Sequence, residues 1–527
     1  MTKRSISKRA KLAASLLVAT SATVAGVAAT SPRAHATPRR NVVVVEVDDM
    51  RTDELPYMTK TLARLQGTTF SKSYVSTSLC CPSRAAFLSG QYSQNNKVQN
   101  NSGFHQFDQA NTLATWLHNS GYFTSIIGKY LNGYGCASPT PPGWDHWQAL
   151  CSNIYSMLSY KLKDGANLVS YGNSAADYQT DVLSARATAT ITEANATGKP
   201  FFIWLTPTAP HTGPGGRFAA RYKNAFATYK LPVTANRPET DVTDKPAWIQ
   251  AKPVISTKGF GSIRQTEIGR LRMLAAADDL VASVVSQLSA VGQLANTDVI
   301  FTSDNGYMRG EHRLTSGKEV GYEESVSVPL VASGPDFPIA TSNELVQNTD
   351  LAPTIADISG VVPGRVVDGR SLLPIATGAS WPQRVIRHFV TQDSTGDGGS
   401  ANHPRADGVR TSRFSYFQLA TGEQELYDHQ VDPLELTNKI GDPSYKSAQA
   451  RLASINTTLK TCAGITCQID IGNLAPTASE TALCPNLVCT FDASQSGDLD
   501  GSIISYHWDF GDGTSATSPN PSVTHSY

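Results

Sequence analysis

The segment 41–47 (Asn-Val-Val-Val-Val-Glu-Val) limits the possible folds more than any other part of the chain. A strand that is apolar at consecutive positions is buried on both faces, as strands of parallel sheets are. Similar apolar runs recur at 122–127, 201–205, 298–302 and 328–332, and segments with helical spacing, such as 265–288, lie between them. This alternation predicts an α/β fold in which a mixed, mostly parallel sheet lies between helices.

Polar residues follow these predicted strands directly. Asp48-Asp49 follows the first run, Gly128-Lys129 the second, Pro210-His211 the third and Asp304-Asn305 the fourth. Each of these alone is typical of a helix cap, a turn or a solvated surface residue. In parallel sheets, however, chemistry collects at the carboxyl ends of the strands, so we expect these residues to form one site.

The pattern changes at about residue 385. Segments 410–419 and 424–427 are typical of short antiparallel strands, and 445–460 is typical of a helix. We therefore predict a catalytic α/β domain at 41–384 and a smaller α+β subdomain at 385–470. Residues 474–527 are rich in Thr, Ser and Asp, and 506–513 is typical of a strand with an Asp-Gly turn, which predicts an all-β tail.

Residues 1–36 have a basic start, an apolar stretch at 12–29 and a small-residue site at Ala34-His35-Ala36. This predicts a secretory signal peptide cleaved near Ala36, and hence a secreted, extracellular protein; a membrane anchor is the alternative. Without the six basic residues of 1–36, the chain has 38 basic and 44 acidic residues, which argues against nucleic acid or an anionic membrane as a partner. We expect no other stretch to span a bilayer.

Eight cysteines suit an oxidising compartment. Their spacing favours three bridges that would close short loops: Cys136–Cys151, Cys462–Cys467 and Cys484–Cys489. The remaining pair, Cys80 and Cys81, is adjacent in sequence and poorly placed to form a disulfide. Zinc binding is the competing interpretation, but the chain has no two C-x2-C spacings.

Residues 79–90 (Leu-Cys-Cys-Pro-Ser-Arg-Ala-Ala-Phe-Leu-Ser-Gly) resemble the sulfatase signature C-x-P-S-R-x-x-x-L-T-G, with Ser89 where Thr is usual. The resemblance implies that a formylglycine-generating enzyme oxidises Cys80 to formylglycine, whose hydrated aldehyde is the nucleophile. It also implies an alkaline-phosphatase-like fold and hydrolysis of the sulfate esters of a sulfated carbohydrate or an aryl sulfate.

The same resemblance implies roles for the residues at the strand ends. The calcium ligands would be Asp48, Asp49, Cys80 as formylglycine, Asp304 and Asn305, an oxygen set that suits a hard cation. Three groups would hold the sulfate and leaving-group oxygens: Lys129, His211 and Lys318. Arg84 would fix the formylglycine hydroxyl, Asp304 would take its proton, and His211 would protonate the departing alcohol.

Segments 128–132 (Gly-Lys-Tyr-Leu-Asn), 100–101 and 303–307 further resemble the N-acetylglucosamine-6-sulfatase subgroup. Many sulfatases have a histidine two residues after the lysine at position 129, but this chain has Leu131. The proton acceptor for elimination therefore stays open, with His312 and His105 as candidates.

The tail resembles a PKD domain through the segments 491–494 and 508–513. The usual closing strands of that domain would lie beyond Tyr527, so we expect it to be incomplete. Two other functions stay open: a phosphonate or phosphodiester hydrolase of the same superfamily, and a catalytically dead polysaccharide-binding protein.

Overall fold

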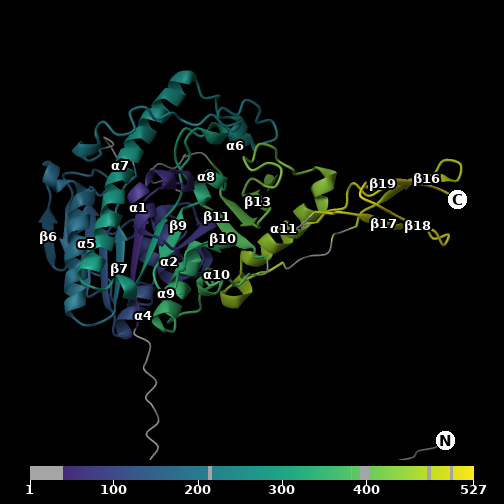
Figure 1. Cartoon of the computed structure of the whole chain (residues 1–527). Helices are drawn as coiled ribbons and strands as arrows, with labels where there is room; N and C mark the ends of the chain where they lie inside the picture. The colour runs from purple at the N-terminus through teal and green to yellow at the C-terminus, as the bar shows by residue number, and fades with distance from the viewer. Residues whose placement is uncertain are drawn as a thin grey trace, which may run out of the picture. The chain divides into compact units, whose positions relative to one another are not determined.

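The structure, a computed structural model, describes residues 39–211, 217–381, 383–391, 403–471, 476, 478–498 and 502–527, so the predicted signal peptide lies outside the described residues. Its main element is a ten-stranded sheet (Figure 1). The strand order is β10 (Ala340–Gln347), β2 (Thr68–Tyr74), β9 (Leu330–Ser333), β8 (Thr297–Ser303), β1 (Asn41–Val47), β7 (Phe201–Thr206), β3 (Phe123–Gly128), β4 (His146–Ser152), β5 (Lys161–Asp164) and β6 (Asn167–Ser170).

The strand β1 lies in the centre of this sheet and is parallel to both of its neighbours, β7 and β8. All seven of its residues are buried, as its apolar run predicts. Val42 and Val44 pack into one hydrophobic core, whereas Val43 and Val45 pack into a second core on the opposite face. The predicted α/β fold, with a sheet covered on both faces, is confirmed.

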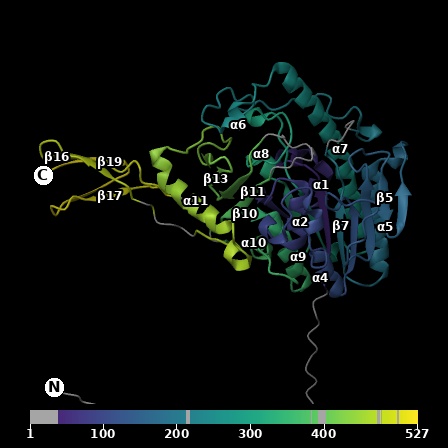
Figure 2. The ribbon, with the colours of Figure 1, turned by 180° about the vertical axis from the view of Figure 1, so that it is seen from behind.

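The helices divide between these two cores (Figures 1 and 2). Residues of α2 (Cys80–Ser89), α4 (Leu113–Asn119) and α9 (Leu351–Ser359) line the first core, and residues of α5 (Gln179–Ala196) and α7 (Thr257–Ala290) line the second. The shorter helices are α1 (Thr59–Arg64), α3 (Ser93–Asn96), α6 (Ala247–Gln250), α8 (Glu323–Val326) and α10 (Leu373–Ala376).

The helix α7 corrects one sequence prediction. Its length and mean hydropathy of 1.2 are those of a segment able to cross a membrane, although we expected none outside residues 1–36. Its apolar face packs against the sheet, and 56% of its most apolar window is buried. A core helix of a soluble protein has the same composition.

A second, four-stranded antiparallel sheet follows, in the order β11 (Ile386–Val390), β12 (Ala406–Arg410), β13 (Phe414–Leu419) and β14 (Gln424–Asp428). The helix α11 (Lys446–Leu459) packs against it. The antiparallel strand predicted at 410–419 is confirmed over 414–419 as β13, whereas residues 411–413 form the connection from β12. The tail contains β15 (Thr481–Leu483), β16 (Val488–Asp492), β17 (Tyr506–Asp509), β18 (Ser515–Ser518) and β19 (Ser522–Ser526), all in antiparallel pairs.

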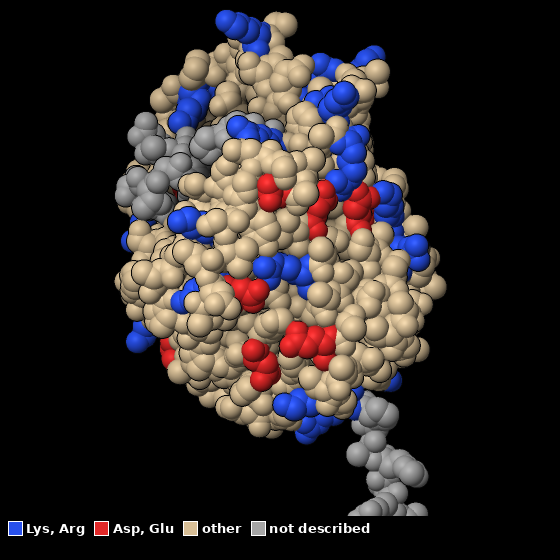
Figure 3. Space-filling model, turned by 90° about the vertical axis from the view of Figure 1, so that its left-hand side faces the viewer, with Lys and Arg blue, Asp and Glu red and all other residues tan. Residues whose placement is uncertain are grey.

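The predicted strands at 122–127, 201–205 and 298–302 correspond to β3, β7 and β8. The run at 328–332 corresponds to β9, which is antiparallel to both β2 and β8. All three disulfides suggested by the cysteine spacing are present, and Cys80 and Cys81 stay outside them. On the face shown in Figure 3, basic and acidic side chains of the described residues are interspersed.

Candidate active site

The carboxyl ends of the central strands bring the predicted site residues together. Asp48 and Asp49 follow β1, Lys129 follows β3, and Asp304 and Asn305 follow β8. The other members are Cys80 and Arg84 of α2, His211 beyond β7, and Lys318 in the connection after β8. Hydrogen bonds and ion pairs join all nine into one cluster, and all nine are at least 94% buried.

Cys80 is the first residue of α2 and is fully buried. Its Sγ atom accepts a hydrogen bond from Lys318 Nζ at 2.8 Å and lies 3.6 Å from Asp48 Oδ1. Burial raises the pKa of the Cys80 thiol well above its ordinary value, and Lys129 and Lys318 oppose this only in part. A thiol in this environment stays protonated and is a weak nucleophile.

Three cations neutralise the buried aspartates. Lys129 Nζ donates to Asp48 Oδ2 at 2.6 Å, and Lys318 Nζ donates to Asp49 Oδ1. Arg84 Nε donates to Asp304 Oδ2 at 2.8 Å, so each aspartate has its own cationic partner.

These pairs keep the aspartates charged despite their burial. Burial alone would raise the pKa of Asp48 and of Asp49, but Lys129 and Lys318 respectively, each with His211, hold both pKa values below their ordinary range. Burial would likewise lower the pKa of each lysine, yet the paired aspartate raises it well above its ordinary value. The site therefore holds fixed charges of both signs in a region of low dielectric.

The oxygen-bearing side chains fit a hard cation. Asn305 Nδ2 donates to Asp49 Oδ1 at 2.6 Å, which leaves the buried Asn305 Oδ1 without a hydrogen-bond partner among the described residues. A buried amide oxygen without a partner costs free energy unless a ligand satisfies it. Asp49 also has a φ of 69°, a strained value for a side-chain-bearing residue that is typical of ligand-holding positions. With Asp48 and Asp304, these oxygens suit calcium.

His211 faces this cluster, with Nε2 at 3.6 Å from Asp49 Oδ2. Four atoms that could bind a metal lie within 4.8 Å of one another: a ring nitrogen of His211, a carboxylate oxygen of Asp48, a carboxylate oxygen of Asp49 and the Cys80 Sγ atom. The ring of Tyr155 stacks on the imidazole, with centroids 4.0 Å apart and an interplanar angle of 14°. Burial lowers the pKa of His211, and Asp49 and Asp48 oppose this in part.

The sequence did not single out several residues that support the site. Glu46, inside the valine run of β1, lies 3.7 Å from Arg84 and accepts a hydrogen bond from Trp204 at 3.0 Å. Arg270 of α7 donates to the backbone oxygen of Asp49 at 2.6 Å and pairs with Glu54 at 3.0 Å. Arg270 could have been identified from the sequence, because it is a charged residue at a position where the helical pattern predicts an apolar one. Tyr155 lies in a loop with no recognisable pattern.

The two histidines considered for the elimination step lie elsewhere. His105 is exposed on the short helical turn Gly103–Gln106. His312 is fully buried in another cluster, where Nδ1 lies 2.7 Å from Glu239 Oε2 and the ring stacks on Tyr322 at 4.1 Å. Among the histidines of the described residues, His211 is the one that lies against the cluster around Cys80.

Comparison with known proteins agrees with this geometry. The sulfatase family model matches residues 40–361, the C-terminal model of N-sulphoglucosamine sulphohydrolase matches 310–461, and the PKD domain model matches 473–527. The first of these covers more than half of the chain and includes all nine site residues.

Individual relatives point in the same direction. The chain is 35% identical to the N-acetylglucosamine-6-sulfatase of Capra hircus over 71% of this chain and 70% of the relative. It is 32% identical to an extracellular sulfatase homolog of Drosophila melanogaster over 66% of this chain and 33% of that protein.

A solved structure shares the fold, with a TM-score of 0.68, 23% identity and coverage of 80% of this chain and 98% of the other. That protein is described as bound to its substrate D-glucosamine-2-N,6-O-disulfate. The family match, the relatives and the fold agree: the chain belongs to the sulfatase family, the hydrolases of sulfuric esters.

Proposed function

We propose that the protein is a secreted, calcium-dependent sulfatase that uses a formylglycine made from Cys80 to remove sulfate from a 6-sulfated N-acetylglucosamine. The observation that carries this proposal is the position of Cys80. Its side chain lies at the start of α2, between Lys318 and Asp48, inside a cluster of paired aspartates and cations. Because Cys80 is fully buried, a formylglycine-generating enzyme would have to act on it before the chain folds.

The surrounding cations would bind the sulfate ester. A sulfate monoester is an anion that resists nucleophiles, so charge on its oxygens has to be neutralised before attack. The ammonium groups of Lys129 and Lys318 point into the cluster, and Arg84 donates a hydrogen bond to the Asp304 carboxylate. Asp48, Asp49, Asp304 and Asn305 would hold calcium, which supplies further positive charge and lowers the pKa of the hydrate hydroxyl.

The reaction would then need three proton transfers. One hydroxyl oxygen of the hydrate attacks sulfur while Asp304 takes its proton, and the bond from sulfur to the alcohol oxygen breaks. His211 protonates that oxygen, and the negative charge of the bound ester favours the protonated imidazole. Release of sulfate would need the third transfer, from the second hydroxyl to a base such as the now neutral His211, as the carbon–oxygen bond to sulfate breaks and the aldehyde forms again. Water rehydrates the aldehyde for the next turnover.

The relatives support the finer details of the proposal. The similarity to N-acetylglucosamine-6-sulfatase favours a 6-sulfated sugar, and the similarity to an extracellular sulfatase favours secretion.

Mass spectrometry of protein from a host with the modifying enzyme tests the nucleophile. We expect an aldehyde at Cys80, no activity in Cys80→Ala, and activity in the matched control Cys81→Ala, whose side chain is equally buried and equally outside the disulfides. A fully active enzyme with an unmodified Cys80 would refute the proposal.

The substrate is tested by kcat/KM for N-acetylglucosamine 6-sulfate against 2-, 3- and 4-sulfated sugars, nitrophenyl sulfate and a phenylphosphonate ester. A preference for another sulfated position would refute the 6-sulfate assignment alone. A preference for the phosphonate would favour the alternative hydrolase.

A further inference from the structure

The helix α7 extends well beyond the sheet that it covers. It has 34 residues, about 51 Å at 1.5 Å per residue, whereas β1 has seven residues, about 23 Å. Arg270 marks the level of the catalytic edge because it contacts the backbone oxygen of Asp49 at the end of β1. The part of α7 before Arg270 therefore projects past the strand ends as a wall beside the site, as Figure 1 shows.

A cavity of about 700 Å³ lies along this part of the helix, within the range of about 300–1,000 Å³ typical of ligand pockets. Arg270 and Tyr307 lie at its catalytic end, and the guanidinium of Arg270 lies 4.5 Å from the Tyr307 ring. Thr315 and Ser316 line another part, two to three residues before Lys318. The cavity therefore begins next to the cluster around Cys80.

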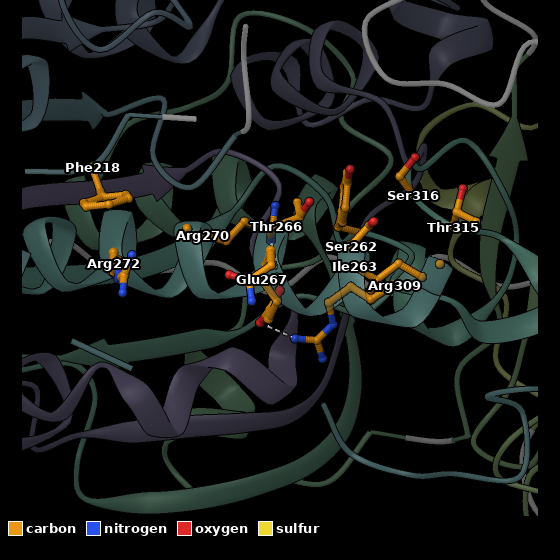
Figure 4. Close-up of a pocket in the computed structure, with 14 residues that line it drawn as sticks. Phe218, Ser262, Ile263, Thr266, Glu267, Arg270, Arg272, Arg309, Thr315 and Ser316 are labelled. Carbon is orange, nitrogen blue, oxygen red and sulfur yellow. Dashed lines mark hydrogen bonds and ion pairs between the residues drawn. The ribbon is translucent and has the colours of Figure 1, made fainter. Parts of the chain in front are cut away.

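The exposed polar side chains along this cavity are mostly uncharged. Ser262, Gln265 and Thr266 of α7 are exposed, as are Thr315 and Ser316 across the cavity. Figure 4 shows Phe218 and Arg272 at one end of the row and Thr315 and Ser316 at the other.

The charged groups of the lining are already engaged. Arg309 pairs with the buried Glu267, while Arg309 Nε has no hydrogen-bond partner among the described residues. Arg272 lies 4.7 Å from the Phe218 ring and donates to the Ala225 backbone oxygen at 2.8 Å. The cavity thus offers hydroxyl and amide groups, the aromatic rings of Phe218 and Tyr307, and the partly exposed guanidinium of Arg272.

We propose that this cavity binds the sugar residues that flank the sulfated one, so that the substrate is an oligosaccharide or polysaccharide chain. The inference rests on the proposed function and adds the length of the substrate to it. Hydroxyl and amide side chains match the alternating donors and acceptors of a sugar, and an aromatic ring matches its apolar face. The half-exposed Arg272 accommodates a carboxylate or sulfate on a neighbouring residue.

Gly269 allows the cavity to be filled without disturbing the fold. It lines the cavity, and a Cβ atom added there meets nothing within 4 Å. Gly261 lies on the same helix with equally open surroundings but outside the lining. Replacing a helical glycine also favours the helix, so Gly269→Phe and the control Gly261→Phe should both fold.

The test compares kcat/KM for nitrophenyl sulfate, N-acetylglucosamine 6-sulfate and a tetrasaccharide containing that same sulfated residue. We expect the wild type to prefer the tetrasaccharide to the monosaccharide, and Gly269→Phe to lower kcat/KM for the tetrasaccharide at least about tenfold. Nitrophenyl sulfate hydrolysis should be unchanged in both variants, and Gly261→Phe should match the wild type throughout. The double variant Gln265→Ala/Thr266→Ala should weaken the tetrasaccharide preference through KM.

Equal activity of the wild type on both sugars, or an equal loss on both sugars in Gly269→Phe, would overturn the inference while the proposed function stands. A wild type that hydrolyses nitrophenyl sulfate but neither sugar would overturn the proposed sugar substrate, and this inference with it.

Discussion

Substitutions in the buried ion pair of Lys129 and Asp48 can separate an effect on catalysis from an effect on the stability of the fold. Both side chains are at most 1% exposed, and their charged atoms lie 2.6 Å apart. Replacing Lys129 with Met keeps much of the side-chain volume but leaves the Asp48 carboxylate without its nearest cation. Breaking a buried ion pair costs about 3–5 kcal/mol. Arg84 remains 3.7 Å from the same carboxylate, so we expect a loss of about 3 kcal/mol in the free energy of unfolding.

The double variant Lys129→Met/Asp48→Asn should recover part of that stability, because no unpaired charge remains. For residues in contact we expect a coupling of about 2 kcal/mol, within the usual range of 0.5–3 kcal/mol. Activity should not recover, because loss of one preorganised charge at the ester oxygens lowers kcat about 10²–10³-fold.

Urea unfolding followed by tryptophan fluorescence, in a chelator so that metal binding does not contribute, measures the stability terms. Nitrophenyl sulfate hydrolysis in calcium measures activity. Lys60→Met is the control, because Lys60 is exposed and pairs with Asp279 at the surface, where such pairs contribute at most about 1 kcal/mol. Additive single-variant losses, or a Lys129→Met enzyme with near-normal kcat, would refute the reasoning.

Three further predictions concern the metal site, a disulfide and a buried histidine. Asn305→Ala should weaken calcium binding at least about tenfold in a calcium titration, and an unchanged affinity would exclude Asn305 as a ligand. Removing the Cys136–Cys151 disulfide, which spans 15 residues, should lower the free energy of unfolding by about 3 kcal/mol, as measured by urea unfolding. Removing the Cys462–Cys467 disulfide, which spans five residues, should lower it by about 2 kcal/mol. Burial lowers the pKa of His388 to about 3, whereas a histidine in the unfolded chain has a pKa of about 6.5. Below pH 6.5 the unfolded chain therefore binds a proton that the folded chain does not, and the wild type loses stability as the pH falls. His388→Leu should remove about 2 kcal/mol of that loss between pH 6.5 and 5, and an unchanged pH slope would contradict the assignment.

The catalytic edge could be predicted because each buried strand ends in a chemically distinctive residue. Asp48 and Asp304 directly follow the apolar strands β1 and β8, and the topology of a parallel sheet brings such positions together. The direction of a strand was harder to predict, because an apolar run has the same pattern in either direction. The strand β9, for example, is antiparallel to both of its neighbours.

The residues that the sequence missed act through long-range contacts. Glu46 belongs by its position to a buried strand, and its role depends on Arg84 from a helix 38 residues later. Tyr155 reaches His211 from the connection that follows β4. Such pairings are set by loop geometry, which local propensity and hydrophobic period do not determine.

The charge balance of the site predicts that the proposed calcium is needed for substrate binding but not for folding. Three aspartates face three cations, Arg84, Lys129 and Lys318, and burial raises the pKa of the nearby Glu46 to about 7. The protein alone is therefore close to neutral here, which permits folding without metal but attracts a sulfate ester only weakly. One calcium ion would add two positive charges in a poorly screened region, so the excess charge that binds the anion would come from the metal. Chelation should accordingly abolish sulfate binding while the fold persists, unlike a structural zinc site, whose loss unfolds the protein.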